Sequence, residues 1–220
     1  MSRRTPSING LYAITPDCID TADLLRRCRL ALNGGARVLQ YRNKNADTTL
    51  RLQQANALRQ LTREFGIPLI INDDVHLAGQ VDAEGVHLGA ADGSLDEARA
   101  LLGKHKIIGI SCYNRLSLAR DAVDAGADYV AFGAFFSSRV KPEAAVADIA
   151  ILRQARVELA VPLVAIGGIT TSNGLSLVQA GADALAVISA LFDAADITAS
   201  AQEFSSVFNP NFSVTQDLAT

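Results

Sequence analysis

The chain has 220 residues, of which 49% are hydrophobic, and a formal net charge of −3 at pH 7. This length and composition can bury a substantial core within one domain, and the near-neutral charge argues against a dominant nucleic-acid surface or polybasic membrane patch. The sequence has no apolar run of membrane-spanning length, no secretory signal at its start and no paired spacing among its three cysteines. We therefore expect a cytoplasmic protein that binds neither nucleic acid nor a membrane.

Short apolar segments rich in β-branched residues recur along the chain and predict strands. Between them lie segments of helical period, such as 21–35 and 48–66. Apolar strands that alternate with helices indicate a parallel sheet covered by helices, and eight such strands favour a (β/α)8 barrel, also called a TIM barrel, over an open doubly wound sheet. The predicted strands cover residues 11–15, 38–42, 68–73, 85–89, 107–112, 129–133, 162–168 and 184–189.

A weak internal repeat supports this alternation. The segments DAGADYVAFG (124–133) and QAGADALAVIS (179–189) both place Gly-Ala-Asp between a helix end and a strand, and NGGARVLQYR (33–42) is a looser copy. Glycine suits such a turn because it adopts positive φ without strain. No low-complexity linker divides the chain, so we predict one domain over residues 1–208 and a flexible C-terminal tail over 209–220.

Polar residues follow the predicted strands at the end where active sites of such barrels lie. Alternate residues of a strand share a face, so the second strand would carry an amide, a guanidinium and an ammonium in a row. Later strands end in carboxylates, hydroxyls, another lysine and a glycine pair. In chain order these residues are Gln40, Arg42, Lys44, Asn72, Asp73, Asp92, Ser111, Ser137, Ser138, Arg139, Lys141, Gly167, Gly168 and Ser189.

This set predicts two anion sites at one barrel mouth. Gly167-Gly168 and Ser189 follow the seventh and eighth strands, a common place for phosphate in these barrels. Asp73 and Asp92 lie on neighbouring loops and offer the hard oxygen ligands that suit Mg²⁺ together with phosphate oxygens. A phosphate site on one side and a cationic, metal-binding site on the other imply two phosphorylated substrates.

The ordered motifs resemble the thiamine-phosphate synthase family over nearly the whole chain, from LYAITPD to AVISALF. They include QYRNK, PLIINDDVHLA, GVHLG, IIGIS, DYVAFG, PLVAIGGIT and GADALAVIS in the order of the family. The resemblance implies a (β/α)8 barrel that joins a hydroxymethylpyrimidine diphosphate to a thiazole phosphate. The products are thiamine phosphate and pyrophosphate, and Mg²⁺ assists the departure of the pyrophosphate.

The resemblance also implies roles for individual residues. Asp73 and Asp92 would hold Mg²⁺, and Arg42, Lys44, Ser111 and Lys141 would act on the phosphates or the reacting centre. The remaining substrate contacts would come from Gln40, Asn72 and Ser138 on the pyrimidine diphosphate, and from Gly168, Ile188 and Ser189 on the thiazole phosphate. A homo-oligomer is compatible with the sequence.

Two features depart from the family pattern. The loop after the sixth strand usually carries a threonine before its lysine, whereas this chain has Val140 before Lys141. Ala90 and Ala91 stand where more polar residues are expected before Asp92, which leaves fewer groups to orient that carboxylate. Either change predicts reduced activity or altered substrate handling.

Simpler structural interpretations remain open for several of these residues. Asp73, or more readily Asp74, would suit the cap of a helix that begins near Val75. Arg42 and Lys44 would also serve as ion-pair partners at the barrel mouth, and Ser189 would suit an N-cap. His87, within a strand, is expected to be a hydrogen-bonded wall residue.

Three other functions compete with the synthase. A related thiazole tautomerase would not need the diphosphate and metal sites. A non-catalytic paralogue would bind thiazole phosphate or thiamine phosphate without turnover, and Val140 and Ala90 are the features that favour it. A sugar-phosphate isomerase on the same barrel would need an acid–base pair at the strand ends, which we do not find.

Overall fold

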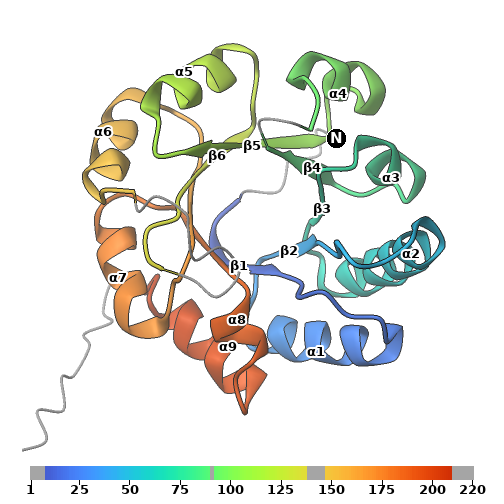
Figure 1. The fold of residues 1–220 in the computed structure, drawn as a ribbon. Helices are drawn as coiled ribbons and strands as arrows, with labels where there is room; N and C mark the ends of the chain where they lie inside the picture. The colour runs from blue at the N-terminus through green and yellow to red at the C-terminus, as the bar shows by residue number, and fades with distance from the viewer. Residues whose placement is uncertain (1–7, 90–91, 138–146, 210–220) are drawn as a thin grey trace, which may run out of the picture.

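A computed structural model describes residues 8–89, 92–137 and 147–209 of the chain. Eight parallel strands form a closed barrel in chain order, as the sequence predicts. Helices follow the strands and form a ring outside the barrel (Figure 1). The strands are β1 (Gly10–Ile14), β2 (Val38–Tyr41), β3 (Leu69–Asn72), β4 (Gly85–Leu88), β5 (Ile107–Tyr113), β6 (Tyr129–Phe132), β7 (Leu163–Ile166) and β8 (Ala184–Val187).

The helices begin and end at residues suited to these positions. Asp47 caps the first turn of α2 by accepting a hydrogen bond from Leu50 N, and Gly66 ends that helix with φ +66°. No helix in the described ranges is long and apolar enough to cross a membrane. The helices are α1 (Thr21–Asn33), α2 (Thr48–Phe65), α3 (Val75–Gln80), α4 (Leu95–Leu102), α5 (Leu116–Asp124), α6 (Ala150–Glu158), α7 (Thr171–Gln179), α8 (Ser189–Phe192) and α9 (Ile197–Ser206).

The barrel wall is buried on both faces, which explains why its strands are nearly continuous apolar runs. One apolar cluster lies between the sheet and the surrounding helices, where Leu39 of β2 and Leu58 of α2 are fully buried. A second, smaller cluster fills the barrel interior and includes Tyr12, Ile70 and Tyr129. The interior is therefore packed with side chains, and the space for ligands lies at its mouth.

The repeated Gly-Ala-Asp turns tie strands together at the end where the strands begin. Gly126 and Gly181 adopt φ +94° and +115°, as predicted for these turns. The aspartates add a contact that the repeat did not predict: Asp128 accepts a hydrogen bond from Ile108 N of β5, and Asp183 accepts one from Leu163 N of β7. This end of the barrel is thus held by fixed polar contacts, while the opposite end is left for the site.

The second strand is shorter than its sequence pattern predicts. It ends at Tyr41, so only Val38 and Gln40 alternate within a strand, whereas Arg42 and Lys44 follow it. The chain leaves the sheet there because Thr15 Oγ1 accepts a hydrogen bond from Arg42 N and donates one to Arg42 O, both at 2.8 Å. The two cations are consequently placed by a loop and not by the strand pleat.

Candidate active site

The cationic loop after β2 is organised by an aspartate from the neighbouring strand end. Asp17, just after β1, accepts hydrogen bonds from the Arg42 guanidinium at 3.2 Å and from Lys44 N at 2.8 Å. We did not predict a role for Asp17 from the sequence. Such a role could have been predicted, because Asp17 lies just after the first strand, and the other site residues were predicted from their positions after strands. Arg42 is held closely, with 17% of its side chain exposed, whereas Lys44 is 57% exposed and free to meet a ligand.

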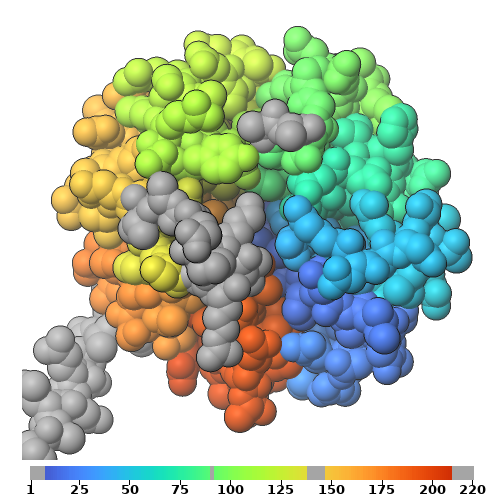
Figure 2. All heavy atoms as spheres, in the orientation of Figure 1, coloured from blue at the N-terminus to red at the C-terminus, as the bar shows by residue number. Residues whose placement is uncertain are grey.

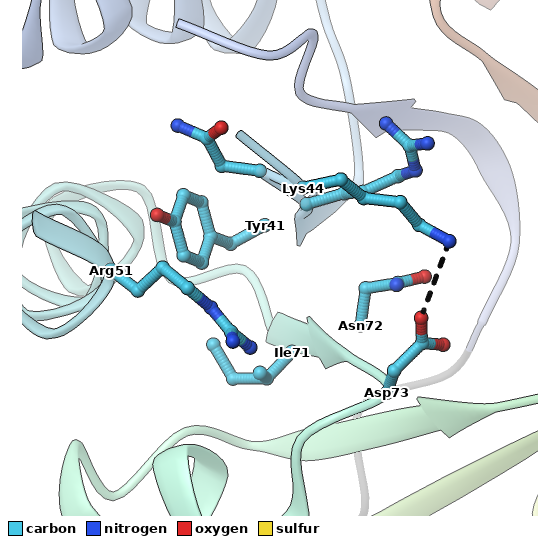
Figure 3. Close-up of a pocket in the computed structure, with 8 residues that line it drawn as sticks. Tyr41, Lys44, Arg51, Ile71, Asn72 and Asp73 are labelled. Atoms are coloured by element: carbon cyan, nitrogen blue, oxygen red, sulfur yellow. Dashed lines mark ion pairs between the residues drawn. The ribbon is translucent and has the colours of Figure 1, made fainter. Parts of the chain in front are cut away.

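Lys44 and Asp73 face each other across a crevice at the ends of β2 and β3. Lys44 Nζ lies 3.9 Å from Asp73 Oδ2, and Figure 3 shows the lysine side chain pointing toward this carboxylate with Asn72 beside it. Arg51 of α2 also lines the crevice, together with Arg42. Four of the predicted site residues and one that was not predicted, Arg51, thus border one polar space.

Asp73 is held in a backbone conformation unusual for a residue with a side chain. Its φ is +64°, and its N–H donates to His87 O of β4 at 2.8 Å. Burial, followed by the hydrogen bond and charge of Asp92, raises the pKa of Asp73 to about 6, whereas Lys44 acts in the opposite direction. Two neighbouring carboxylates whose negative charges repel each other are suited to share a cation.

Asp74 holds the capping role, as the sequence favoured. Asp74 is the N-cap of α3: its Oδ1 accepts from Leu77 N at 2.8 Å and its Oδ2 pairs with Arg51 Nη2 at 2.9 Å. Asp74 is therefore committed to structure, whereas Asp73 turns its carboxylate toward Lys44 and Asp92. The backbone of Asp73 has a positive φ and that of Asp74 does not, so the two side chains point to different partners.

The Asp73–Asp92 pair fits a magnesium ion that is completed by ligands from outside the protein. Asp92 Oδ2 accepts a hydrogen bond from Gly89 N at 2.7 Å, which fixes it at the end of β4. Within the described residues no group of three or more histidine, cysteine or acidic side chains could hold a metal ion. Mg²⁺ commonly uses one or two carboxylates with phosphate oxygens and waters, so this pair would suit Mg²⁺ together with a phosphorylated ligand.

Ser111 lies near the end of β5, partly exposed, and is joined to the barrel interior. Its Oγ is 2.8 Å from His87 Nε2, and the other nitrogen of His87 lies 2.9 Å from the Tyr129 hydroxyl. The prediction that His87 is a hydrogen-bonded wall residue is therefore confirmed. Gln40 is also buried in this interior, where its amide nitrogen donates to the Tyr12 hydroxyl at 2.8 Å.

Glycines after β7 form a narrow backbone turn on the other side of the mouth. Gly167 and Gly168 adopt φ +102° and +62°. A Cβ on Gly168 would lie 2.4 Å from the carbonyl oxygen of Ser137, closer than real contacts allow. The pair thus serves a turn, and both glycines are partly exposed at the end of β7, the strand that pairs with β8.

Ser189 is not the N-cap that the sequence suggested. It is the first residue of α8, and Ile188 is the cap position, with no side-chain capping bond. An aliphatic residue at the cap leaves the first amides of this short helix without a side-chain partner. Ile188 and Ser189 remain predicted contacts of the thiazole phosphate.

The predicted residues fall into two groups on neighbouring strands. One group comprises Gln40, Arg42, Lys44, Asn72, Asp73, Asp92 and Ser111 around β2 to β5, and the other comprises Gly168, Ile188 and Ser189 around β7 and β8. Figure 2 views the barrel from the end at which the strands finish, with the lime atoms that follow β5 and the yellow atoms that follow β6 in front. Ser138, Arg139, Val140, Lys141, Ala90 and Ala91 lie outside the described residues.

Comparison with known proteins decides the family. The family model described as thiamine monophosphate synthase matches residues 11–191. A thiamine-phosphate synthase of Methylobacillus flagellatus is 58% identical over 93% of this chain and 97% of its own length, and one of Thiobacillus denitrificans is 52% identical over 90% and 94%. The chain belongs to the thiamine-phosphate synthase family.

A solved structure agrees with the family assignment and with the fold. The thiamine phosphate pyrophosphorylase of Pyrococcus furiosus is 36% identical, covers 90% of this chain and 94% of its own, and superposes with a TM-score of 0.82. The family resemblance drawn from the ordered motifs is thereby confirmed. The roles of individual residues within the family site stay predictions.

Proposed function

We propose that the chain is a thiamine-phosphate synthase that joins 4-amino-2-methyl-5-hydroxymethylpyrimidine diphosphate to 4-methyl-5-(2-hydroxyethyl)thiazole phosphate. The products are thiamine phosphate and pyrophosphate. The convergence of Lys44, Asp73 and Asp92 from three strand ends is the observation that carries this proposal. A tautomerase or a simple thiazole-phosphate binder has no need for such a combined cation and carboxylate site.

The β2–β5 side supports departure of the diphosphate. Arg42 and Lys44 bring two positive charges to the crevice, and Ser111 adds a hydroxyl near the end of β5. Preorganised positive groups stabilise the negative charge that develops on a leaving group, and they are most effective at sites shielded from water. Lys141 would add a further charge from the loop after β6.

Asp73 and Asp92 would hold Mg²⁺ against the same diphosphate. The ion would neutralise charge on the diphosphate oxygens and so favour their release. Asp73 lies opposite Lys44, so the diphosphate would be contacted by the ammonium and by the metal pair at once. Asn72, next to Asp73 at the end of β3, would contact the same substrate.

The β7–β8 side supports binding of the thiazole phosphate. We expect Gly168→Ala to raise the KM for thiazole phosphate by about tenfold or more, with a smaller effect on the KM for the pyrimidine diphosphate. The added Cβ would clash with carbonyl oxygens of Ser137 and Phe136 at 2.4 and 2.7 Å, so the turn must shift. A poorly placed turn loses roughly the energy of one or two hydrogen bonds to phosphate.

Gly66→Ala is the matched control for this substitution. Gly66 has a nearly equal φ of +66°, but a Cβ there has no heavy atom within 4 Å, and the residue ends α2 away from the mouth. Initial rates would be measured with each substrate varied in turn. A similar rise in KM for both variants would assign the effect to backbone strain and would remove the phosphate role from Gly168.

A reaction with and without each substrate tests the proposed function itself. Purified protein is incubated with both substrates and Mg²⁺, and thiamine phosphate is followed by fluorescence after oxidation to thiochrome. The synthase requires both substrates. Absence of product, with thiazole phosphate still bound in calorimetry, would refute the synthase and favour the binding paralogue or the tautomerase.

A further inference from the structure

A chain of four hydrogen bonds crosses the barrel interior and ends at the mouth. Gln40 Nε2 donates to the Tyr12 hydroxyl at 2.8 Å, and the Tyr12 and Tyr129 hydroxyl oxygens are 2.8 Å apart. Tyr129 lies 2.9 Å from His87 Nδ1, and His87 Nε2 lies 2.8 Å from Ser111 Oγ. Five side chains from five different strands thus form one line of polar contacts through an apolar core.

A single glycine leaves the space in which two members of this hydrogen-bond chain, His87 and Tyr129, meet. Gly109 of β5 lies opposite His87 of β4 on one side and opposite Tyr129 of β6 on the other. A Cβ on Gly109 would fall 1.9 Å from Tyr129 Cζ. The missing side chain lets the two rings stack across β5, with centroids 5.5 Å apart and planes at 21°.

The protons of the chain can be assigned a single direction. Tyr12 is 1% exposed and already accepts a hydrogen bond from Gln40, so its own proton goes to the only other partner found among the described residues, the Tyr129 hydroxyl. The Tyr129 proton then goes to His87 Nδ1. Since a neutral imidazole has one donor and one acceptor nitrogen, His87 carries its proton on Nε2 and donates it to Ser111.

If the hydrogen bonds ran in the opposite direction, one hydroxyl proton would be left without an acceptor. If His87 Nδ1 donated to Tyr129 and Tyr129 donated to Tyr12, the Tyr12 hydroxyl would accept twice. Its proton would then have no acceptor among the side chains that the structure describes, which is costly. Burial favours the uncharged imidazole, since the His87 ring stacks on the fully buried ring of Tyr129. It also raises the pKa of both tyrosines, which therefore keep their protons at neutral pH.

We propose that Tyr129 and His87 are positioning residues that hold the Ser111 hydroxyl as a hydrogen-bond donor toward an oxygen of the bound diphosphate. This inference rests on the proposed function. With its oxygen accepting from His87, Ser111 directs its proton out of the core, where the partly exposed hydroxyl meets the mouth. If the hydrogen bonds ran the other way, Ser111 would donate its proton to His87 and would offer only lone pairs to an anion.

The tautomer of His87 tests the direction without any enzyme assay. The chain has three histidines, His76, His87 and His105, and the signals of His87 can be identified by their loss in His87→Gln. Long-range ¹H–¹⁵N correlation spectra of the histidine-labelled protein should show the proton of His87 on Nε2. A proton on Nδ1 would overturn the proposal.

A double-mutant cycle tests whether Tyr129 acts through Ser111. We expect Tyr129→Phe to lower kcat roughly 10- to 100-fold, as for groups that orient metal ligands, with the KM for thiazole phosphate unchanged. In a Ser111→Ala background the same substitution should lower kcat by less than about threefold. An equal loss in both backgrounds would mean that Tyr129 has only a structural role, and would refute the proposal.

Two further variants keep this test decisive. Thr62→Val removes another buried hydroxyl, one that donates to the Arg59 carbonyl oxygen within α2 outside the barrel, and it should leave kcat within about twofold. If Tyr129→Phe does not fold, Tyr12→Phe interrupts the chain one bond earlier and carries the same expectation. If wild-type protein makes no thiamine phosphate, the proposed function fails. The His87 tautomer still decides the direction of the hydrogen bonds.

Discussion

Asp73→Ala and Asp92→Ala are each expected to lower kcat by about 100- to 1000-fold, the loss found when one preorganised group that stabilises a developing charge is removed. Both carboxylates interact with each other, and Asp73 also faces Lys44. Removing one would leave the proposed Mg²⁺ ion with a single protein ligand and should raise the metal concentration needed for turnover. The measurement is the rate of thiamine phosphate formation as a function of Mg²⁺ concentration.

Asp124→Ala is the control for these variants. Asp124 is exposed at the end of α5 and has no part in the strand-end site. It should keep the wild-type rate and the wild-type metal requirement. Near-wild-type turnover with an unchanged metal requirement in both Asp73→Ala and Asp92→Ala would show that these carboxylates are not the magnesium ligands.

Gly109→Ala is expected to lower the free energy of unfolding by about 3 kcal/mol or more, at the upper end of what overpacking a core costs. The new Cβ would lie 1.9 Å from Cζ and 2.2 Å from Cε1 of Tyr129, whose ring is fully buried. The ring cannot rotate away without entering other interior side chains, so the strands must separate. Urea unfolding followed by circular dichroism gives the value.

Gly79→Ala tests the same substitution where there is room. Gly79 lies within α3, and a Cβ there meets its nearest neighbour, Leu101, at 3.4 Å. Alanine favours a helix interior by up to about 1 kcal/mol over glycine, so this variant should be as stable as wild type or more stable. If Gly109→Ala unfolds at the wild-type urea concentration, the interior is not packed as described.

The fold could be predicted because each strand is a separate apolar run bounded by turn residues. Gly126 and Gly181 have the positive φ that their place between helix and strand requires. The ends of strands were harder to predict. The pattern Gln40-Arg42-Lys44 continues the alternation of β2, yet the strand stops at Tyr41 because Thr15, from the neighbouring strand end, binds both backbone groups of Arg42.

Other parts of the site depend on contacts that no local pattern contains. Asp73 and Asp74 are adjacent residues of the same type. Asp73 has a φ of +64° and faces Lys44, whereas Asp74 caps α3. Asp17 was missed because its partners, Arg42 and Lys44, lie 25 and 27 residues away in the chain.

The interior hydrogen-bond chain could not be predicted from the sequence for a similar reason. His87 and Tyr129 lie on β4 and β6, which are not neighbours, and they meet only because Gly109 on β5 lacks a side chain at that level. The sequence shows a histidine in a strand and a glycine in IIGIS, but the register that brings them together comes from the closed barrel.

The metal dependence of product formation tests the central claim most directly. Purified protein is treated with a chelator, supplied with both substrates, and titrated with Mg²⁺ while thiamine phosphate is measured as thiochrome. We predict no product without the metal and a saturable return of activity as it is added. Thiamine phosphate formation at full rate in the presence of excess chelator would contradict the account of Asp73 and Asp92.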